Sequence, residues 1–150
     1  MAIHIAEAES PGGPWFSRGM LMASFGYEEF ERSWIGAGGP PISLGNDRFL
    51  MIYHVGHFRH DGAREYDLAA ALLDFSRRQV VVSRIEPVLR PQTDWEKTGD
   101  ISVGVDNVVF SCANLRIGDE VVVPYAGADS RMLVSSTNFD QLVAALEKSF

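Results

Sequence analysis

The sequence predicts an all-β domain that ends in one short helix, and three observations support this prediction. Apolar and polar residues alternate through most of the chain, the spacing that places every second side chain on one face of a sheet. Fourteen glycines and seven prolines divide the chain into short segments. Helical spacing of apolar residues appears only after Asn138. Short strands at nearly regular spacing are typical of a sandwich, a barrel or a propeller, and periodicity alone leaves these three open.

The first half of the chain contains four expected strands. The third is the strongest, because it is rich in aromatic and β-branched residues. The fourth is ambiguous, since its Ala and Leu residues favour a helix. We assign it as a strand because Gly62 precedes it and three valines at 80–82 follow after a short polar link. The four strands are residues 3–8, 19–24, 48–55 and 65–75, with a turn at 10–14.

The second half continues this pattern and then changes to a helix. Residues 85–91 are extended, because each of their two prolines restricts the residue before it. Residues 116–119 have the composition of a hairpin turn between two strands, expected at 103–115 and 120–125. A further strand is expected at 131–136. Asn138 then caps a helix over 139–148, in which Phe139, Leu142, Val143 and Leu146 share one face.

Composition limits the classes of function. A chain of 150 residues with 46% hydrophobic and 22% charged residues suits a single soluble globular domain covering residues 1–150. The net charge of −7 argues against nucleic acid and anionic membrane surfaces as partners. No segment has the roughly 20 apolar residues that span a bilayer, and the first ten do not form the apolar core of a signal peptide. A single cysteine, Cys112, excludes an intrachain disulfide and fits a cytoplasmic location.

Five short motifs occur in a fixed order along the chain. Each is weak alone, but together they resemble the second half of the β-mannoside phosphorylases and mannosidases of glycoside hydrolase family 130. The resemblance runs from about Ile3 to Leu146, and it implies a partial five-bladed β-propeller, about half of the family's ring. The motifs are Ile-Gly-Ala-Gly-Gly-Pro-Pro-Ile (35–42), Met-Ile-Tyr-His (51–54), Ala-Ala-Ala-Leu-Leu-Asp (69–74), Asp-Asn-Val-Val-Phe-Ser-Cys (106–112) and Pro-Tyr-Ala-Gly-Ala-Asp-Ser (124–130).

The glycine-rich motif does not fit a nucleotide site. The third glycine of a dinucleotide loop would fall at Pro41, and no Gly-Lys-Ser/Thr follows, so the residues alone indicate a tight turn entering a strand. In the family the similar segment lines the central cavity, and the lysine at its head helps to hold phosphate. Trp34 stands at that position here and supplies no cation. Trp34 could instead stack on a sugar face, which leaves open whether phosphate is bound.

The resemblance implies four further residues that line a sugar cavity, and each also has a structural interpretation. His54 matches a histidine of the family's phosphate or water pocket, yet a lone histidine at a strand end is often held by a backbone carbonyl. Tyr66 matches a cavity tyrosine but also suits a half-buried strand position. Asn107 could bind a sugar hydroxyl or cap a turn. Asp129 matches a residue of the sugar subsite and equally suits a turn.

A metal site is not expected. His54, His57 and His60 are spaced by three, but the first two would point to opposite faces of an extended strand. The resemblance implies no cofactor either. In the family the general acid and the arginines that hold phosphate come from the first half of the chain, so we assign no catalytic residue here.

Two functions therefore stay open. The first is a carbohydrate-active protein acting on a β-linked mannoside, with Trp34, His54, Tyr66, Asn107 and Asp129 at the sugar and the acid supplied from elsewhere. The second is a non-catalytic sugar-binding or assembly module. An incomplete propeller leaves open sheet edges, so the expected macromolecular partner is either a second copy of the chain or a complementary half-propeller.

Overall fold

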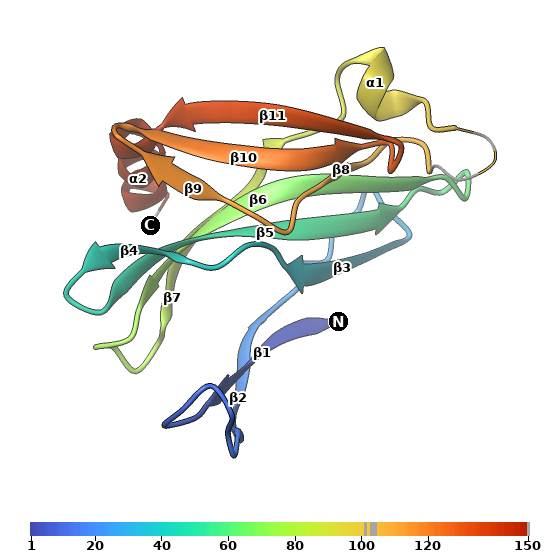
Figure 1. Cartoon of the computed structure of the whole chain (residues 1–150). Coiled ribbons are helices and arrows are strands. Elements are labelled where there is room, and N and C mark those ends of the chain that lie inside the picture. Colours follow the sequence, from blue (N-terminus) through green and yellow to red (C-terminus); the bar gives the residue numbers. More distant parts are fainter. Residues whose placement is uncertain (101, 103–104, 150) are drawn as a thin grey trace.

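A computed structural model describes residues 1–100, 102 and 105–149. The fold is mostly β with a C-terminal helix, as the sequence predicts. Figure 1 shows three antiparallel sheets in layers, with the largest sheet between the other two. The strands are β1 (Ala2–Glu7), β2 (Phe16–Ala23), β3 (Arg32–Ala37), β4 (Ile42–Gly45), β5 (Arg48–Phe58), β6 (Arg64–Asp74), β7 (Val81–Leu89), β8 (Val109–Phe110), β9 (Leu115–Ile117), β10 (Glu120–Gly127) and β11 (Arg131–Asn138), and the helices are α1 (Asp94–Lys97) and α2 (Phe139–Lys148).

The central sheet has the strand order β3-β5-β6-β7, with β4 also pairing with β5. β5 and β6 pair without a break from Arg48↔Asp74 to Phe58↔Arg64. The ambiguous segment 65–75 is therefore a strand, and the helical alternative is wrong. Its small residues Ala69, Ala70 and Ala71 are all fully buried. Alanine side chains are small and apolar, so they pack closely under the layers that cover both faces of this strand.

Two hydrophobic cores lie on the two faces of this sheet. On one face, Leu50 and Ile52 of β5 pack against Val121 of β10. On the opposite face, Met51 and Tyr53 pack against the hairpin formed by β1 and β2. Because successive strand residues point to opposite faces, a strand buried on both sides has a nearly continuous apolar sequence. This explains why β5 and β6 are the strongest strand signals in the chain.

The outer sheets follow from local turn and cap residues. In the hairpin joining β10 to β11, Ala128 and Asp129 both have positive φ, 46° and 49°, and the N–H of Ser130 donates to the Gly127 carbonyl at 3.1 Å. This geometry is that of a type I′ turn, which matches the twist of the two strands. Asn138 caps α2 as predicted, since its side-chain oxygen accepts from the N–H of Gln141 at 3.0 Å.

The prediction of one continuous strand over 103–115 is wrong. Residues 103 and 104 lie outside the described residues, and beyond them only Val109–Phe110 and Leu115–Ile117 are strands. Asn107 has φ +58°, a left-handed conformation that interrupts an extended chain. The short helix α1, which the sequence analysis did not predict, holds this segment through two backbone hydrogen bonds: Asn107 N–H to Lys97 at 3.2 Å and Val108 N–H to Glu96 at 2.9 Å.

In the described part of the chain, no helix is both long and apolar enough to cross a membrane.

Candidate functional site

Two of the five predicted site residues meet at one end of the central sheet. Trp34 of β3 lies opposite Gly56, and Gly56 lies opposite Tyr66 of β6, so the three residues form one row across three strands. The rings of Trp34 and Tyr66 are 5.4 Å apart in an edge-to-face arrangement. Both side chains are half-buried. They lie on the face of the sheet that packs against β10, which is also the face that carries His54.

Phe110 extends this row into an aromatic cluster. Its ring is 6.1 Å from that of Tyr66 and stacks on the imidazole of His54 at 3.9 Å. Phe58 lies at the other end, 5.1 Å from Trp34. The sequence analysis quoted the motif that contains Phe110 but did not select it. Its position directly after Val108 and Val109 suggested only a strand residue, since nothing in the spacing shows which aromatic rings will meet.

His54 is buried and faces protein backbone. Its Nε2 is hydrogen-bonded to the backbone of Ser111, whose N–H donates to it at 3.1 Å. Burial lowers the pKa of His54, although hydrogen bonds to the backbone of Ser111 and Ala37 partly oppose this shift. The imidazole is therefore neutral at pH 7. A proline at this position would have no N–H to donate, so this contact requires a residue other than proline at 111.

Asn107 and Asp129 flank the same end of the fold. The backbone carbonyl of Asn107 accepts from the N–H of Tyr66 at 2.9 Å, which ties the half-buried Asn107 to the aromatic cluster. Asp129 is exposed in the turn between β10 and β11. The neighbouring Ala128 donates its N–H to Val108 at 2.9 Å, which joins this turn to the segment that carries Asn107. The structure thus brings four of the predicted residues together around one cluster and places Asp129 in a turn beside it.

The other histidines lie elsewhere. His57 points to the opposite face of the sheet from His54, as predicted, and its Nδ1 is 2.8 Å from Ser33 Oγ. Its ring stacks on Phe30 at 3.9 Å. His60 is exposed, and its Nε2 is 3.4 Å from the Glu28 carbonyl. Within the described residues, no group of three His, Cys, Asp or Glu side chains is arranged to hold a metal ion.

Buried carboxylates form structural networks rather than open sites. Glu86 accepts hydrogen bonds from the hydroxyls of both Tyr27 and Tyr53. Burial, together with this carboxylate, raises the pKa of both tyrosines far above the usual value. Glu96 accepts from Tyr125, from Thr93 and from the N–H of Gln92. The oxygens of both carboxylates are thus already occupied by donors from the protein, so neither group is well placed to act as a general acid.

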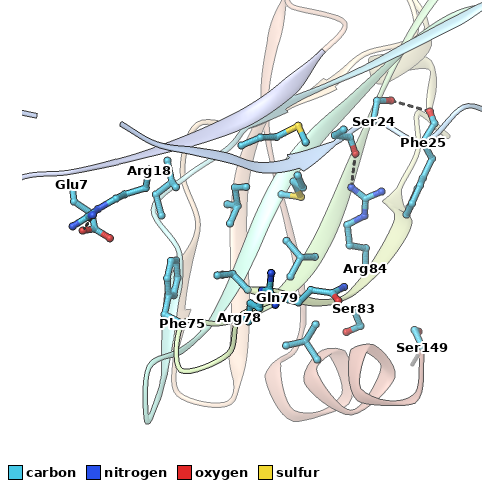
Figure 2. Close-up of a pocket in the computed structure, with 18 residues that line it drawn as sticks. Glu7, Arg18, Ser24, Phe25, Phe75, Arg78, Gln79, Ser83, Arg84 and Ser149 are labelled. Atoms are coloured by element: carbon cyan, nitrogen blue, oxygen red, sulfur yellow. Dashed lines mark hydrogen bonds and ion pairs between the residues drawn. The ribbon is translucent and has the colours of Figure 1, made fainter. Parts of the chain in front are cut away.

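A large groove elsewhere in the described structure does not include the predicted residues. It has a volume of about 850 Å³ and lies between β2 and β7. Figure 2 shows Glu7 and Arg18, paired at 2.8 Å, at one end and Arg84 with Phe25 at the other. Arg84 donates to the Ala23 carbonyl at 2.8 Å and lies 3.5 Å from the Phe25 ring centre. Trp34, His54, Tyr66, Asn107 and Asp129 are all absent from its lining.

The aromatic cluster offers stacking surfaces, an amide and, nearby, a carboxylate. These groups suit a neutral polyhydroxylated ligand, because aromatic faces pack against its C–H groups while polar atoms bind its hydroxyls. None of the five predicted residues is a cation that would bind phosphate.

Comparison with known proteins finds a matching protein family and several relatives. The family model described as beta-1,4-mannooligosaccharide phosphorylase, Glyco_hydro_130, matches residues 16–148. The chain is 41% identical over 102 residues to a 1,2-beta-oligomannan phosphorylase of Thermoanaerobacter sp. (strain X514). It is 31% identical over 123 residues to a beta-1,2-mannobiose phosphorylase of Listeria innocua. These matches cover 67% and 79% of this chain but 31% of each relative.

A solved structure agrees with these matches. The Listeria innocua beta-1,2-mannobiose phosphorylase, in complex with beta-1,2-mannobiose, superposes with a TM-score of 0.75 at 28% identity. The similarity covers 98% of this chain and 39% of that one. The match to the curated relatives thus spans about a third of their length, less than the half expected from the motifs.

Proposed function

The chain belongs to glycoside hydrolase family 130, and we propose that it binds a β-linked mannoside at the aromatic cluster. The observation that carries this proposal is the position of Trp34. One face of its indole lies against the backbone at Gly56, and the half-buried ring keeps part of its surface accessible. A tryptophan backed in this way is a rigid platform on which a sugar ring can stack.

Three other groups would complete the site. Tyr66 supports the indole from its edge, and its hydroxyl can bind a sugar hydroxyl. The amide of Asn107 and the exposed carboxylate of Asp129 offer a donor and acceptors at the rim. His54 would act through Phe110, on which it stacks, and so would position the cluster rather than contact the sugar.

Catalysis by residues 1–150 alone is not part of this proposal. Cleavage of a glycosidic bond needs a carboxylic acid at the leaving oxygen and a nucleophile on the opposite face. The buried carboxylates Glu86 and Glu96 are engaged in structural hydrogen bonds. Any turnover would depend on an acid from further chain, and Trp34 in place of a lysine favours binding that does not need phosphate.

The layered sheets also support the wider proposal of a partial five-bladed propeller. β3, β5, β6 and β7 form a four-stranded antiparallel meander, the unit from which propeller blades are built. An experimental structure of the protein with whatever chain completes the ring would test this arrangement. The cytoplasmic location expected from the single cysteine also stays a prediction.

Calorimetric titration with β-1,2-mannobiose tests the binding proposal. Saturable binding to the wild-type protein is expected, and a Trp34→Ala variant should bind roughly tenfold more weakly, equivalent to about 1.4 kcal/mol. Trp15→Ala is the matched control, because Trp15 is exposed on the far hairpin. Absence of binding, or equal loss in the two variants, would contradict the proposal. Turnover assays with and without phosphate distinguish an enzyme from the alternative, a non-catalytic binding module.

A further inference from the structure

The strand β11 has a free edge that is unusually well suited to pairing. All eight of its residues pair in unbroken register with β10, from Glu120↔Asn138 to Gly127↔Arg131. Among the described residues, no strand pairs with its other edge. Soluble proteins usually protect such an edge with lysine, proline or a bulge. The sequence of β11, Arg-Met-Leu-Val-Ser-Ser-Thr-Asn, contains neither residue, its register has no bulge, and only Arg131 is charged.

The outward face of this strand is apolar and exposed. Met132 and Val134 are 77% and 69% exposed, the highest values among the large hydrophobic side chains described. They lie opposite Ala126 and Pro124 of β10, which share their face. The centre of this face thus carries no charged side chain, although the whole chain has a net charge of −7. A second copy approaching here would meet no acidic group on the strand itself.

An apolar groove adjoins the free edge. It has a volume of about 460 Å³ and runs between β11 and β7, with Ile85, Val88 and Leu89 on the β7 side. Three successive residues of β11, 135–137, line it. Since successive strand residues point to opposite faces, the presence of all three indicates that the edge of the strand borders the groove, which Gln141, Leu142 and Ala145 of α2 also line. A strand added to β11 would therefore also cover this groove.

We propose that β11 pairs edge to edge with β11 of a second copy, antiparallel about a two-fold axis, so that one sheet continues across the dimer. A free strand edge is complementary to itself under two-fold symmetry, and two-fold dimers are the commonest oligomers. The two-fold axis stands perpendicular to the shared sheet, so the apolar face of one copy continues that of the other. Residues opposite each other must then point to the same face, so an even-numbered residue pairs with an even-numbered one. This places the axis at a residue rather than between two.

The sequence of β11 favours Val134 as that residue. With the axis there, Val134 lies opposite its counterpart in the second copy, and Met132 lies opposite Ser136. The apolar centre of the strand is then shared, and seven residues of each strand, 131–137, are paired. This interface lies on the outer sheet, and its formation is independent of sugar binding at the aromatic cluster.

Light scattering on fractionated protein over a wide concentration range tests the dimer. The expected mass is twice the 16.6 kDa of one chain. Val134→Lys should weaken the dimer at least tenfold, because it places two like charges directly opposite each other in the shared sheet. Because the Val134 side chain is exposed, the variant should keep its fold, and its circular dichroism spectrum should match that of the wild type. Met20→Lys is the matched control, since Met20 is 62% exposed on β2 and should leave the dimer intact.

Disulfide trapping tests the register independently. In a Cys112→Ser background, Val134→Cys should cross-link rapidly on mild oxidation, because directly opposite residues have Cα atoms about 4.5 to 5.5 Å apart, within disulfide range. Met20→Cys in the same background should cross-link far more slowly. A chain that is monomeric throughout, a dimer that Val134→Lys does not weaken or that Met20→Lys weakens equally, or equal cross-linking of the two cysteine variants would each overturn the proposal.

Discussion

The indole of Trp34 lies directly over Gly56, the residue opposite it on the neighbouring strand. A Cβ atom at residue 56 would be only 2.5 Å from Cζ2 and Nε1 of the indole. Real Cβ atoms do not approach other atoms so closely, so only glycine lets the ring lie flat on the sheet here. The absence of a side chain at residue 56 thus sets the orientation of the proposed sugar platform.

Gly56→Ala should therefore move Trp34 and affect both stability and binding. We expect a loss of about 1–3 kcal/mol in the free energy of unfolding, because the added methyl group overpacks the site. Mannoside affinity should fall with it. Gly12→Ala is the control, since a Cβ atom there meets no atom within 4 Å. Urea unfolding and calorimetric titration of both variants check the prediction. A Gly56→Ala variant with wild-type stability and affinity would contradict it.

The sequence predicted those parts of the fold in which one signal dominates. β5 and β6 have long apolar sequences because both faces of these strands are buried. β10 and β11 were recognised from alternating apolar and polar residues and from the turn between them. The cap at Asn138 marked α2. For residues 105–108, directly before β8, the predicted strand was wrong because their conformation depends on partners distant in the chain. Val105 and Val108 favour a strand, but the left-handed Asn107 and the backbone carbonyls of Glu96 and Lys97 in α1 hold residues 107 and 108 in a loop.

The candidate site was predictable only in part for a similar reason. Motif resemblance selected residues that lie together, such as Trp34 and Tyr66, whose rings are 5.4 Å apart. It could not show that His54 faces the backbone of Ser111 or that Phe110 joins the cluster. These contacts form between strands more than fifty residues apart in the chain, and no local pattern encodes such a distance.

Glu96 should be a major contributor to the stability of the segment that carries Asn107. Burial alone would raise the pKa of this carboxyl, but hydrogen bonds from Thr93, Tyr125 and Gln92 outweigh it and hold the pKa below the usual value. We expect Glu96→Gln to lower the free energy of unfolding by about 2–3 kcal/mol and Tyr125→Phe by about 1–2 kcal/mol.

A double-mutant cycle in urea checks this coupling. Because Glu96→Gln weakens the hydrogen bond that Tyr125→Phe removes, the double variant should lose less stability than the sum of the two single losses. Hydrogen exchange at Val108, whose N–H donates to the Glu96 carbonyl, should accelerate in Glu96→Gln. Strictly additive losses with unchanged exchange would show that Glu96 does not hold this segment.

Asp67 makes the chain sensitive to loss of Arg90. The Asp67 side chain is 1% exposed, its Oδ2 accepts from Arg90 Nε at 3.2 Å, and its Oδ1 has no hydrogen-bond partner among the described residues. Arg90→Gln should lower the free energy of unfolding by about 1–3 kcal/mol, because a buried carboxylate loses its charged donor. Arg18→Gln breaks the exposed pair with Glu7 and should change the free energy of unfolding by only about 0–1 kcal/mol. Equal losses, measured by urea unfolding, would contradict this difference.

His54 should give the protein a stability that depends on pH near neutrality. Burial lowers the pKa of His54 in the folded protein, whereas an unfolded histidine titrates near 6.5. The unfolded chain therefore binds this proton more readily, so the free energy of unfolding should fall as the pH drops below about 6.5 and level off above about 7.5.

Carboxyl groups with a lowered pKa act in a different range. The stability contributed by Asp74, Glu96 and Asp100 is present above their unfolded pKa values, near 4, and is lost only in more acidic solution. Urea unfolding at pH 5, 6, 7 and 8 should thus show a fall between pH 7 and 5 that is smaller in His54→Gln than in the wild type. Parallel curves for the two proteins would show that His54 is not the group responsible, whereas convergence toward low pH would identify its buried, neutral imidazole as the source.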